Sequence, residues 1–147
     1  RRAIDAPPSG DLQLSDEVIA ADHKVNAMEV ALDGDCSQLI VRRQPAAGDL
    51  RMIFAITKTV TDLERIGDEA QKIARMAKNI QERGGGAYSQ PLVQVRHVAE
   101  AAISMLRRTL DAFARLDVDT AREVIRDDAG IDTEFRSILR QLITYIM

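Results

Sequence analysis

Residues 49–82 read DLRMIFAITKTVTDLERIGDEAQKIARMAKNIQE, and their pattern determines the fold class that we predict. Apolar or small residues recur every three or four positions, as they do on the buried face of an amphipathic helix. This stripe consists of Leu50, Ile53, Ile56, Val60, Leu63, Gly67, Ala70 and Ala74. Because so long a helix needs partners along its whole apolar face, we expect a long bundle of coiled-coil type.

Three more stretches show the same helical period, and none shows the strict alternation of a half-buried β-strand. They cover residues 12–43, 92–114 and 117–147. In the first of them, the core line at heptad spacing consists of Val18, Val25, Leu32 and Leu39. The sequence therefore predicts an all-α fold of long antiparallel helices that run up and down.

Four segments rich in proline, glycine or aspartate separate the helices, at residues 6–10, 44–49, 84–91 and 115–119. The prolines of the first segment, APPSG, should end the helix to which the preceding RRAID belongs, because proline lacks the backbone N–H. The third segment, GGGAYSQP, is predicted to be a flexible loop. In the fourth, Asp117 is a suitable N-cap for the helix that follows.

The composition is that of a globular protein, with 46% hydrophobic and 29% charged residues. The net charge of -3 argues against nucleic acid as the main partner, since proteins that bind it usually have a basic surplus. The single cysteine, Cys36, excludes an internal disulfide and fits a reducing, cytoplasmic setting. The sequence contains no run of about 18 apolar residues, so we expect no membrane span.

The chain also contains an internal repeat. The segment DLQLSDEVIAADHKVN at residues 11–26 aligns without gaps with DVDTAREVIRDDAGID at residues 117–132. Such a repeat predicts a unit of about three helices that is used twice. We assign residues 1–83 to a first three-helix repeat that lacks the start of its first helix, and 84–91 to a Gly-rich linker. Residues 92–147 then form a second repeat without its third helix, so we expect the chain to be part of a longer protein.

Acidic residues lie beside the apolar seams of two predicted helices. On the helix 12–43 a polar stripe with spacings of four, three and four consists of Asp22, Asn26, Glu29 and Asp33. On the helix 49–82, Glu64 falls inside the apolar arc and Asp68 lies at its edge. An antiparallel hairpin through residues 44–49 would bring Glu64 opposite Glu29. It would also bring Asp68 close to Asp22 and Asn26.

Carboxylates that converge in a partly dry seam repel one another and lose hydration, so something must neutralise them. Three possibilities remain open: ion pairs with Lys24 and Arg65, protonation of some of the acids, or a bridging metal ion. A ligand set made only of oxygen atoms suits magnesium, calcium, manganese or iron. Gly67 would leave room for the neighbouring helix or for an ion with its waters.

Three arginines cluster around the turn RRQPAAGDLR at residues 42–51, namely Arg42, Arg43 and Arg51. Either they are solvated surface residues whose positive charge is favourable near a helix C-terminus, or they form a docking patch for an acidic partner. No catalytic set can be assembled, because His23 and His97 are isolated and neither lies in a Glu-x-x-His motif. We therefore predict a protein that is not an enzyme. The alternatives are a carboxylate-bundle metalloenzyme and a metal-free helical scaffold.

Several of these segments together resemble the PhoU family of bacterial phosphate-transport regulators. They are DHKVNAMEVALD at 22–33, RRQPAAGDLR at 42–51 and TDLERIGDEAQKIARMA at 61–77. The segment LDAFARLDVDTAREVIRDD at 110–128 resembles the second half of that family. The resemblance implies two tandem three-helix units in a cytoplasmic, homodimeric protein. It also implies a negative regulator of phosphate uptake and of the phosphate-starvation (Pho) regulon, which acts on the ATPase subunit of the Pst transporter and on the PhoR sensor kinase.

The family's E(D)xxxD motifs are associated with multinuclear metal clusters, and the resemblance carries that role onto particular residues. Glu64 and Asp68 correspond to the motif of the third helix, and Asp22 and Asn26 to that of the second. Glu29 and Asp33 have the same spacing, while Asp128 and Asp132 would belong to the cluster of the second unit. The implied metal is iron, magnesium, manganese, calcium or zinc. Asn26 departs from the usual carboxylate, which should weaken or shrink the cluster.

Overall fold

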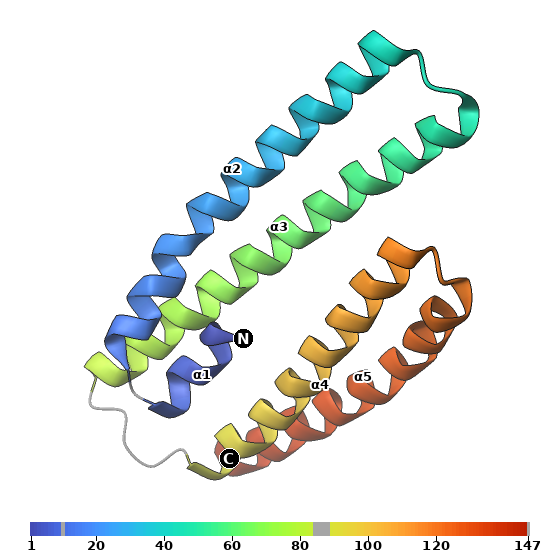
Figure 1. Cartoon of the computed structure of the whole chain (residues 1–147). Coiled ribbons are helices and arrows are strands. Elements are labelled where there is room, and N and C mark those ends of the chain that lie inside the picture. The colour runs from blue at the N-terminus through green and yellow to red at the C-terminus, as the bar shows by residue number, and fades with distance from the viewer. Residues whose placement is uncertain (10, 84–88, 147) are drawn as a thin grey trace. The chain divides into compact units, whose positions relative to one another are not determined.

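The computed structural model describes residues 1–9, 11–83 and 89–146, and within these ranges it consists of five α-helices. They are α1 (Arg2–Ser9), α2 (Leu12–Arg43), α3 (Ala47–Glu82), α4 (Ser89–Arg115) and α5 (Val118–Ile146). The described ranges contain no β-strand, so the predicted all-α fold is confirmed (Figure 1). In the same part of the chain, no helix is both long and apolar enough to cross a membrane.

The chain divides into two compact units, Arg2–Gly84 and Gly85–Met147. In the first unit, α2 and α3 form an antiparallel hairpin, and the short helix α1 packs against both of them (Figure 1). In the second unit, α4 and α5 form an antiparallel hairpin of their own. Most of the predicted linker, residues 84–88, lies outside the described residues. That each unit belongs to a three-helix repeat stays a prediction.

The helix boundaries agree with the sequence pattern except near prolines. Helix α2 covers the predicted residues 12–43, but α1 continues through Pro7 and Pro8 to Ser9, where we predicted a break. Proline's fixed φ is compatible with helical backbone, and the buried side chains of Ala3 and Ala6 bring α1 into contact with its neighbours. Helix α4 begins three residues earlier than predicted. The proline at position 91 therefore lies in the first turn, where backbone N–H groups lack helical partners in any case.

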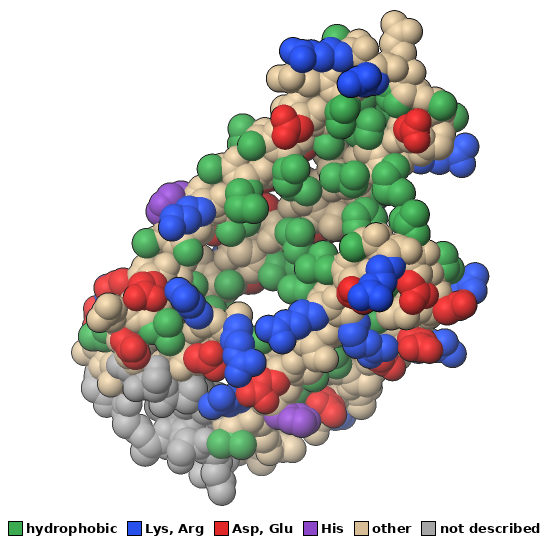
Figure 2. All heavy atoms as spheres, viewed as in Figure 1, with side chains coloured by type: hydrophobic (Ala, Val, Ile, Leu, Met, Phe, Trp, Pro, Cys, Tyr) green, Lys and Arg blue, Asp and Glu red, His purple; other side chains and the backbone are tan. Residues whose placement is uncertain are grey.

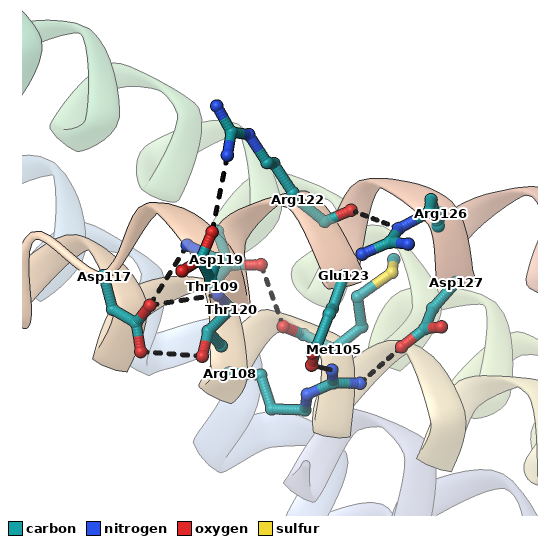
Figure 3. A network of polar contacts seen from close by, with 10 residues as sticks. All are labelled: Met105, Arg108, Thr109, Asp117, Asp119, Thr120, Arg122, Glu123, Arg126 and Asp127. Atoms are coloured by element: carbon teal, nitrogen blue, oxygen red, sulfur yellow. Dashed lines mark hydrogen bonds and ion pairs between the residues drawn. The ribbon is translucent and has the colours of Figure 1, made fainter.

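Asp117 caps α5 as predicted. Its Oδ1 accepts hydrogen bonds from the backbone N–H groups of Asp119 (3.1 Å) and Thr120 (3.0 Å), and the Thr120 hydroxyl donates to Oδ2 at 2.7 Å (Figure 3). The backbone N–H of Thr120, followed by its hydroxyl, holds the pKa of Asp117 below the ordinary value of 3.8. Asp11 caps α2 in the same way, because its side chain accepts a hydrogen bond from the N–H of Leu14 at 3.0 Å.

The capping by Asp117 makes a pH-dependent prediction. Because the pKa of Asp117 is depressed in the folded state, its stabilising effect is complete above 3.8 and is lost as the pH falls through the lower folded pKa. We expect Asp117→Ala to lower the Tm at pH 7, and the difference from wild type to close at acid pH. Asp35→Ala is the matched control, since Asp35 is exposed and caps no helix. A Tm difference that stays constant down to pH 2 would contradict this account.

A polar network runs along one side of the α4–α5 hairpin. The guanidinium of Arg108 on α4 reaches Glu123 at 3.5 Å and also pairs with Asp127, one turn further along α5 (Figure 3). Arg122 pairs with Asp119 at 3.4 Å along α5 itself. All of these side chains are partly exposed, so each pair contributes about 0–1 kcal/mol and serves mainly to fix the register of the hairpin.

The buried core is thin and made of small or medium side chains. In the first unit it consists of Ala3, Ala6, Cys36, Ile53, Ala74 and Ala77. The predicted core line on α2 is only partly correct: Val18 and Val25 are half-buried, whereas Leu32 and Leu39 are 39% and 48% exposed. The reason is that α1 covers only the end where α2 begins and α3 ends (Figure 1). Further along, α2 has α3 as its neighbour within the described chain, and hydrophobic side chains are visible on the surface (Figure 2).

Candidate functional site

The candidate site lies where α2 and α3 approach each other at Gly67. A Cβ atom placed on Gly67 would lie 3.4 Å from Cγ1 of Val25 and 3.8 Å from Oδ1 of Asp22. Residue 67 therefore packs directly against α2, and the missing side chain allows the two helices to come this close. The hairpin thus brings the middle of α3 to the height of Asp22 and Val25, as the sequence predicted.

Asp22 and Asn26 lie one turn apart on α2 and are half-buried in this seam. One carboxylate oxygen of Asp22, Oδ2, accepts a hydrogen bond from Nε2 of Gln71 at 2.9 Å. The other oxygen, Oδ1, is buried and has no hydrogen-bond partner, and the same is true of Oδ1 of Asn26. Buried polar atoms in folded proteins are nearly always satisfied, so two unsatisfied oxygens on residues one helical turn apart indicate a missing donor, water or cation.

Glu64 on α3 experiences the negative charge of this region. Partial burial, followed by the carboxylates of Asp68, Glu29 and Asp22, raises the pKa of Glu64 above its ordinary value, while Arg65 opposes the effect. Glu64 and Asp68 are themselves half-buried. The structure therefore brings acids from both helices close enough for their charges to act on one another.

Within the described chain, the nearby basic side chains form no ion pair with these acids, although the charge of Arg65 acts to lower the pKa of Glu64. Arg65 forms its ion pair with Asp62 at 3.4 Å, and Lys72 forms its own with Glu69 at 2.7 Å. Lys24 is exposed. Within the described residues, no ion pair involves the carboxylates of Asp22, Glu29, Glu64 or Asp68. The interpretation in which Lys24 and Arg65 balance the charge thus has no ion pair to support it.

Other acids from the sequence prediction lie elsewhere. Asp33 is exposed on α2, and Asp128 is exposed on α5. Asp132 is exposed too and accepts a hydrogen bond from Arg136 at 3.3 Å. In residues 1–9, 11–83 and 89–146, no group of three or more His, Cys, Asp or Glu side chains stands ready to hold a metal ion. The seam thus offers free oxygen atoms without a completed set of carboxylate ligands.

Gln71 is the one residue of the site that the sequence analysis missed. It lies three residues after Asp68 and seven after Glu64, and therefore on the same face of α3. Its amide also approaches the main-chain carbonyl of Ile19 at 3.5 Å. The spacing alone could have identified it, but a search restricted to acids, histidines and cysteines passes over a neutral amide.

The three arginines around the turn between α2 and α3 share one end of the hairpin. Gln44 caps α2 in the left-handed conformation (φ 45, ψ 61), with its N–H bonded to the carbonyl of Ile40, and α3 starts at Ala47. This short connection places Arg42, Arg43 and Arg51 at the same end of the hairpin, and basic side chains are visible at this end in Figure 2. All three are exposed, and none forms an ion pair within the described chain.

Comparison with known proteins gives a consistent result. Residues 1–77 and 95–147 match the PhoU domain. The chain is 46% identical over 145 residues to a phosphate-specific transport system accessory protein PhoU homolog of Pseudomonas putida, covering 99% of this chain and 56% of that protein. It is 44% identical over 145 residues to the accessory protein PhoU of Escherichia coli strain K12, covering 99% of this chain and 59% of that protein. The chain therefore spans less than two thirds of the length of these relatives.

A solved structure is similar as well. The crystal structure of PhoU from Pseudomonas aeruginosa superposes with a TM-score of 0.93 at 43% sequence identity, covering 99% of this chain and 69% of that one. At this level of identity, the likeness extends from the sequence to the arrangement of the helices.

Proposed function

The chain belongs to the PhoU family, and we propose that it regulates phosphate uptake by the phosphate-specific transport system. More specifically, we propose a negative regulator that damps transport and represses phosphate-starvation genes when phosphate is plentiful. The names of the relatives, which are accessory proteins of that transport system, support a regulatory role rather than catalysis. The seam between α2 and α3 would serve this role as a cation site.

One observation carries the metal-binding part of the proposal: two buried oxygens, Oδ1 of Asp22 and Oδ1 of Asn26, have no hydrogen-bond partner, in a seam where acids raise the pKa of Glu64. A cation would satisfy both oxygens and remove the repulsion that raises the pKa of Glu64. The donor set fits hard cations, because all of its donors are carboxylate or amide oxygens. Iron, magnesium, manganese and calcium suit it, and zinc suits it less well.

The residues that would hold the cation come from both helices of the hairpin. Asp22 and Asn26 already present free oxygens, whereas Glu64 and Asp68 would have to turn toward α2, since the carboxylates are not grouped as a ready ligand set among the described residues. Glu29 lies close enough to contribute charge. A bound cation would supply charge neutralisation and would fix the α2–α3 pair in one arrangement.

The arginine end of the hairpin is the surface that we propose for docking. Arg42, Arg43 and Arg51 are exposed and unpaired, and such a group complements an acidic surface. The partners that fit the family are the Pst ATPase subunit and a PhoR-type sensor kinase. We also propose that the protein is a cytoplasmic homodimer. Exposed apolar residues such as Phe54 would be covered in a dimer.

Charge reversal of this end tests the docking role. We expect the triple variant Arg42→Glu, Arg43→Glu and Arg51→Glu to lose much of the repression of a phosphate-starvation reporter in rich phosphate. The reason is that three glutamates would repel the acidic surface of the proposed partner. Far-UV circular dichroism should remain unchanged, since all three side chains are exposed. The matched control reverses Arg75, Arg107 and Arg140, which are also exposed and unpaired. Equal repression by both triple variants would rule out this surface.

A further inference from the structure

The side of α2 that points away from α3 is exposed to solvent. Within the described residues, α2 packs against α3 and α1, and its Ser15 and Cys36 are buried there. Lys24 comes two residues after Asp22 of the seam and therefore lies about 200° around the helix axis from it. The exposed residues in line with Lys24 have spacings of four, three, four and four, and we call them the outer stripe: Ala20, Lys24, Ala27, Ala31 and Asp35.

Lys24 and Asp35 place opposite charges on the outer stripe. Both are exposed, and neither forms an ion pair within the described residues. Because they are separated by about 16 Å along one helix, they cannot reach each other. Two such helices packed antiparallel about a twofold axis would bring Lys24 of each copy opposite Asp35 of the other. The outer stripe is therefore complementary in charge to itself.

The twofold axis that pairs these charges would pass between residues 29 and 30, where the side chains suit a close contact between helices. Met28 is 63% exposed and would meet Ala31 of the second copy, so a large apolar side chain would pack on a small one. Gly34, seven residues after Ala27, is exposed as well, and a Cβ built on it would meet nothing from the surrounding structure within 4 Å. The fold thus gives no reason for a glycine that weakens the helix, whereas the close approach of another helix does.

A second pair of charges has the same midpoint. Glu17 and Arg42 are exposed toward the two ends of α2, on the same side as Lys24. In the antiparallel pair they would lie opposite each other, two turns beyond Lys24 and Asp35. Glu17 contacts Arg2 at 3.4 Å, but its side chain is 48% exposed and stays accessible to a second cation. Two sets of charges thus favour one register of the helix pair.

From this pattern we propose that a second copy of the chain packs on the outer stripe, with the two α2 helices antiparallel about a twofold axis at residues 29–30. The inference rests on the homodimer proposed above and names the surface that forms it. A single helix pair buries less area than a large, permanent interface does, so we expect a reversible dimer with a Kd of about 1–100 µM. Because ion pairs contribute, the dimer should weaken as salt is added.

The test is sedimentation equilibrium of the purified chain at low salt over a range of concentrations. Lys24→Glu and Asp35→Lys should each raise the Kd roughly tenfold, because each replaces two symmetry-related attractions by repulsions. The double variant that exchanges the two charges should return to nearly the wild-type Kd. This recovery is expected only if residue 24 of one copy meets residue 35 of the other. Arg42 is left unchanged, so the proposed docking surface is not disturbed.

A variant near the axis provides an independent readout. Ala31→Glu places a carboxylate from each copy beside the axis and should raise the Kd by roughly tenfold or more. Ser37→Glu is the matched control, because Ser37 is exposed on the same helix but lies well off the outer stripe, and it should dimerise as wild type does. Far-UV circular dichroism checks that both variants keep the helical content of wild type.

The outcomes separate the surface from the dimer. A charge-exchanged double variant as weak as the single variants, or wild-type affinity in Ala31→Glu, would overturn the inference while the homodimer stands. Dimerisation that is lost in Phe54→Ser but kept in Ala31→Glu would place the interface on α3 and overturn it as well. Wild-type protein that stays monomeric at roughly 1 mM would refute both the homodimer and this surface.

Discussion

The double variant Glu64→Ala and Asp68→Ala is expected to bind no metal and to keep its helical content. Both side chains are half-buried on α3, and neither forms an ion pair or hydrogen bond within the described residues, so their removal breaks no polar contact of the fold. What is removed is two of the three carboxylates proposed as ligands. Elemental analysis after loading, together with far-UV circular dichroism, measures the two effects separately.

The same variant should also gain thermal stability when it is free of metal. The pKa of Glu64 is raised in the folded state, so the unfolded chain releases this proton first. Ionised Glu64 therefore destabilises the fold at neutral pH, and the penalty disappears as the pH falls through the folded pKa toward the ordinary value of 4.5. The gain in Tm should thus be present at pH 7 and absent near pH 4.

A matched control removes one aspartate and one glutamate from the ends of the same helix. Asp49→Ala with Glu82→Ala makes the same change of charge on exposed positions, and this variant should bind metal as wild type does. Equal metal content in wild type and in the Glu64/Asp68 variant would contradict the proposed ligands. So would wild-type protein that takes up no metal even after loading.

Removal of the gene that encodes this chain is expected to abolish phosphate-dependent repression. If the protein is a negative regulator, phosphate-starvation genes of the alkaline-phosphatase type should then be expressed constitutively in rich phosphate. A chromosomal reporter measured in rich and poor phosphate provides the readout. The effect should be large, because a missing regulator removes the whole signal rather than weakening one contact.

Complementation separates the regulatory role from the role of the metal. Wild-type protein supplied from a plasmid should restore repression, and the Glu64/Asp68 variant should fail to do so if cation binding is needed for regulation. Immunoblotting checks that both proteins accumulate equally. Repression that persists unchanged in the deletion strain would count against the regulatory proposal.

Much of the fold could be predicted because helical period is encoded locally. The apolar repeat gave the bounds of α2, and the chemistry of Asp117 gave the start of α5. The errors came from tertiary context. Periodicity identifies which face of a helix is apolar but not which part of that face finds a partner, so Leu32 and Leu39 are exposed. The proline rule likewise missed the continuation of α1 to Ser9, where packing through Ala6 outweighs local preference.

The candidate site was predicted in part for the same reason. Antiparallel geometry and a short turn suffice to place Glu64 opposite Glu29 and Asp68 close to Asp22, and the charges of all three other acids act on Glu64. The hydrogen bond from Gln71 was missed although Gln71 lies on the same face of α3 as Glu64 and Asp68, because the search considered only acids, histidines and cysteines. The repeat predicted Asp128 and Asp132 as counterparts of Asp22 and Asn26. Similar sequence on one helix does not place further acids opposite that helix, and Asp132 forms an ion pair with Arg136 instead.

The most direct test of the cation site is a crystal of the protein grown with manganese and measured at the manganese absorption edge. An anomalous difference map locates the ion without reference to any assumed ligand. We predict an anomalous peak in the seam between α2 and α3, within coordination distance of Oδ1 of Asp22 and Oδ1 of Asn26. An empty seam at full manganese loading, or peaks found only on exposed acids such as Asp33, would contradict the account.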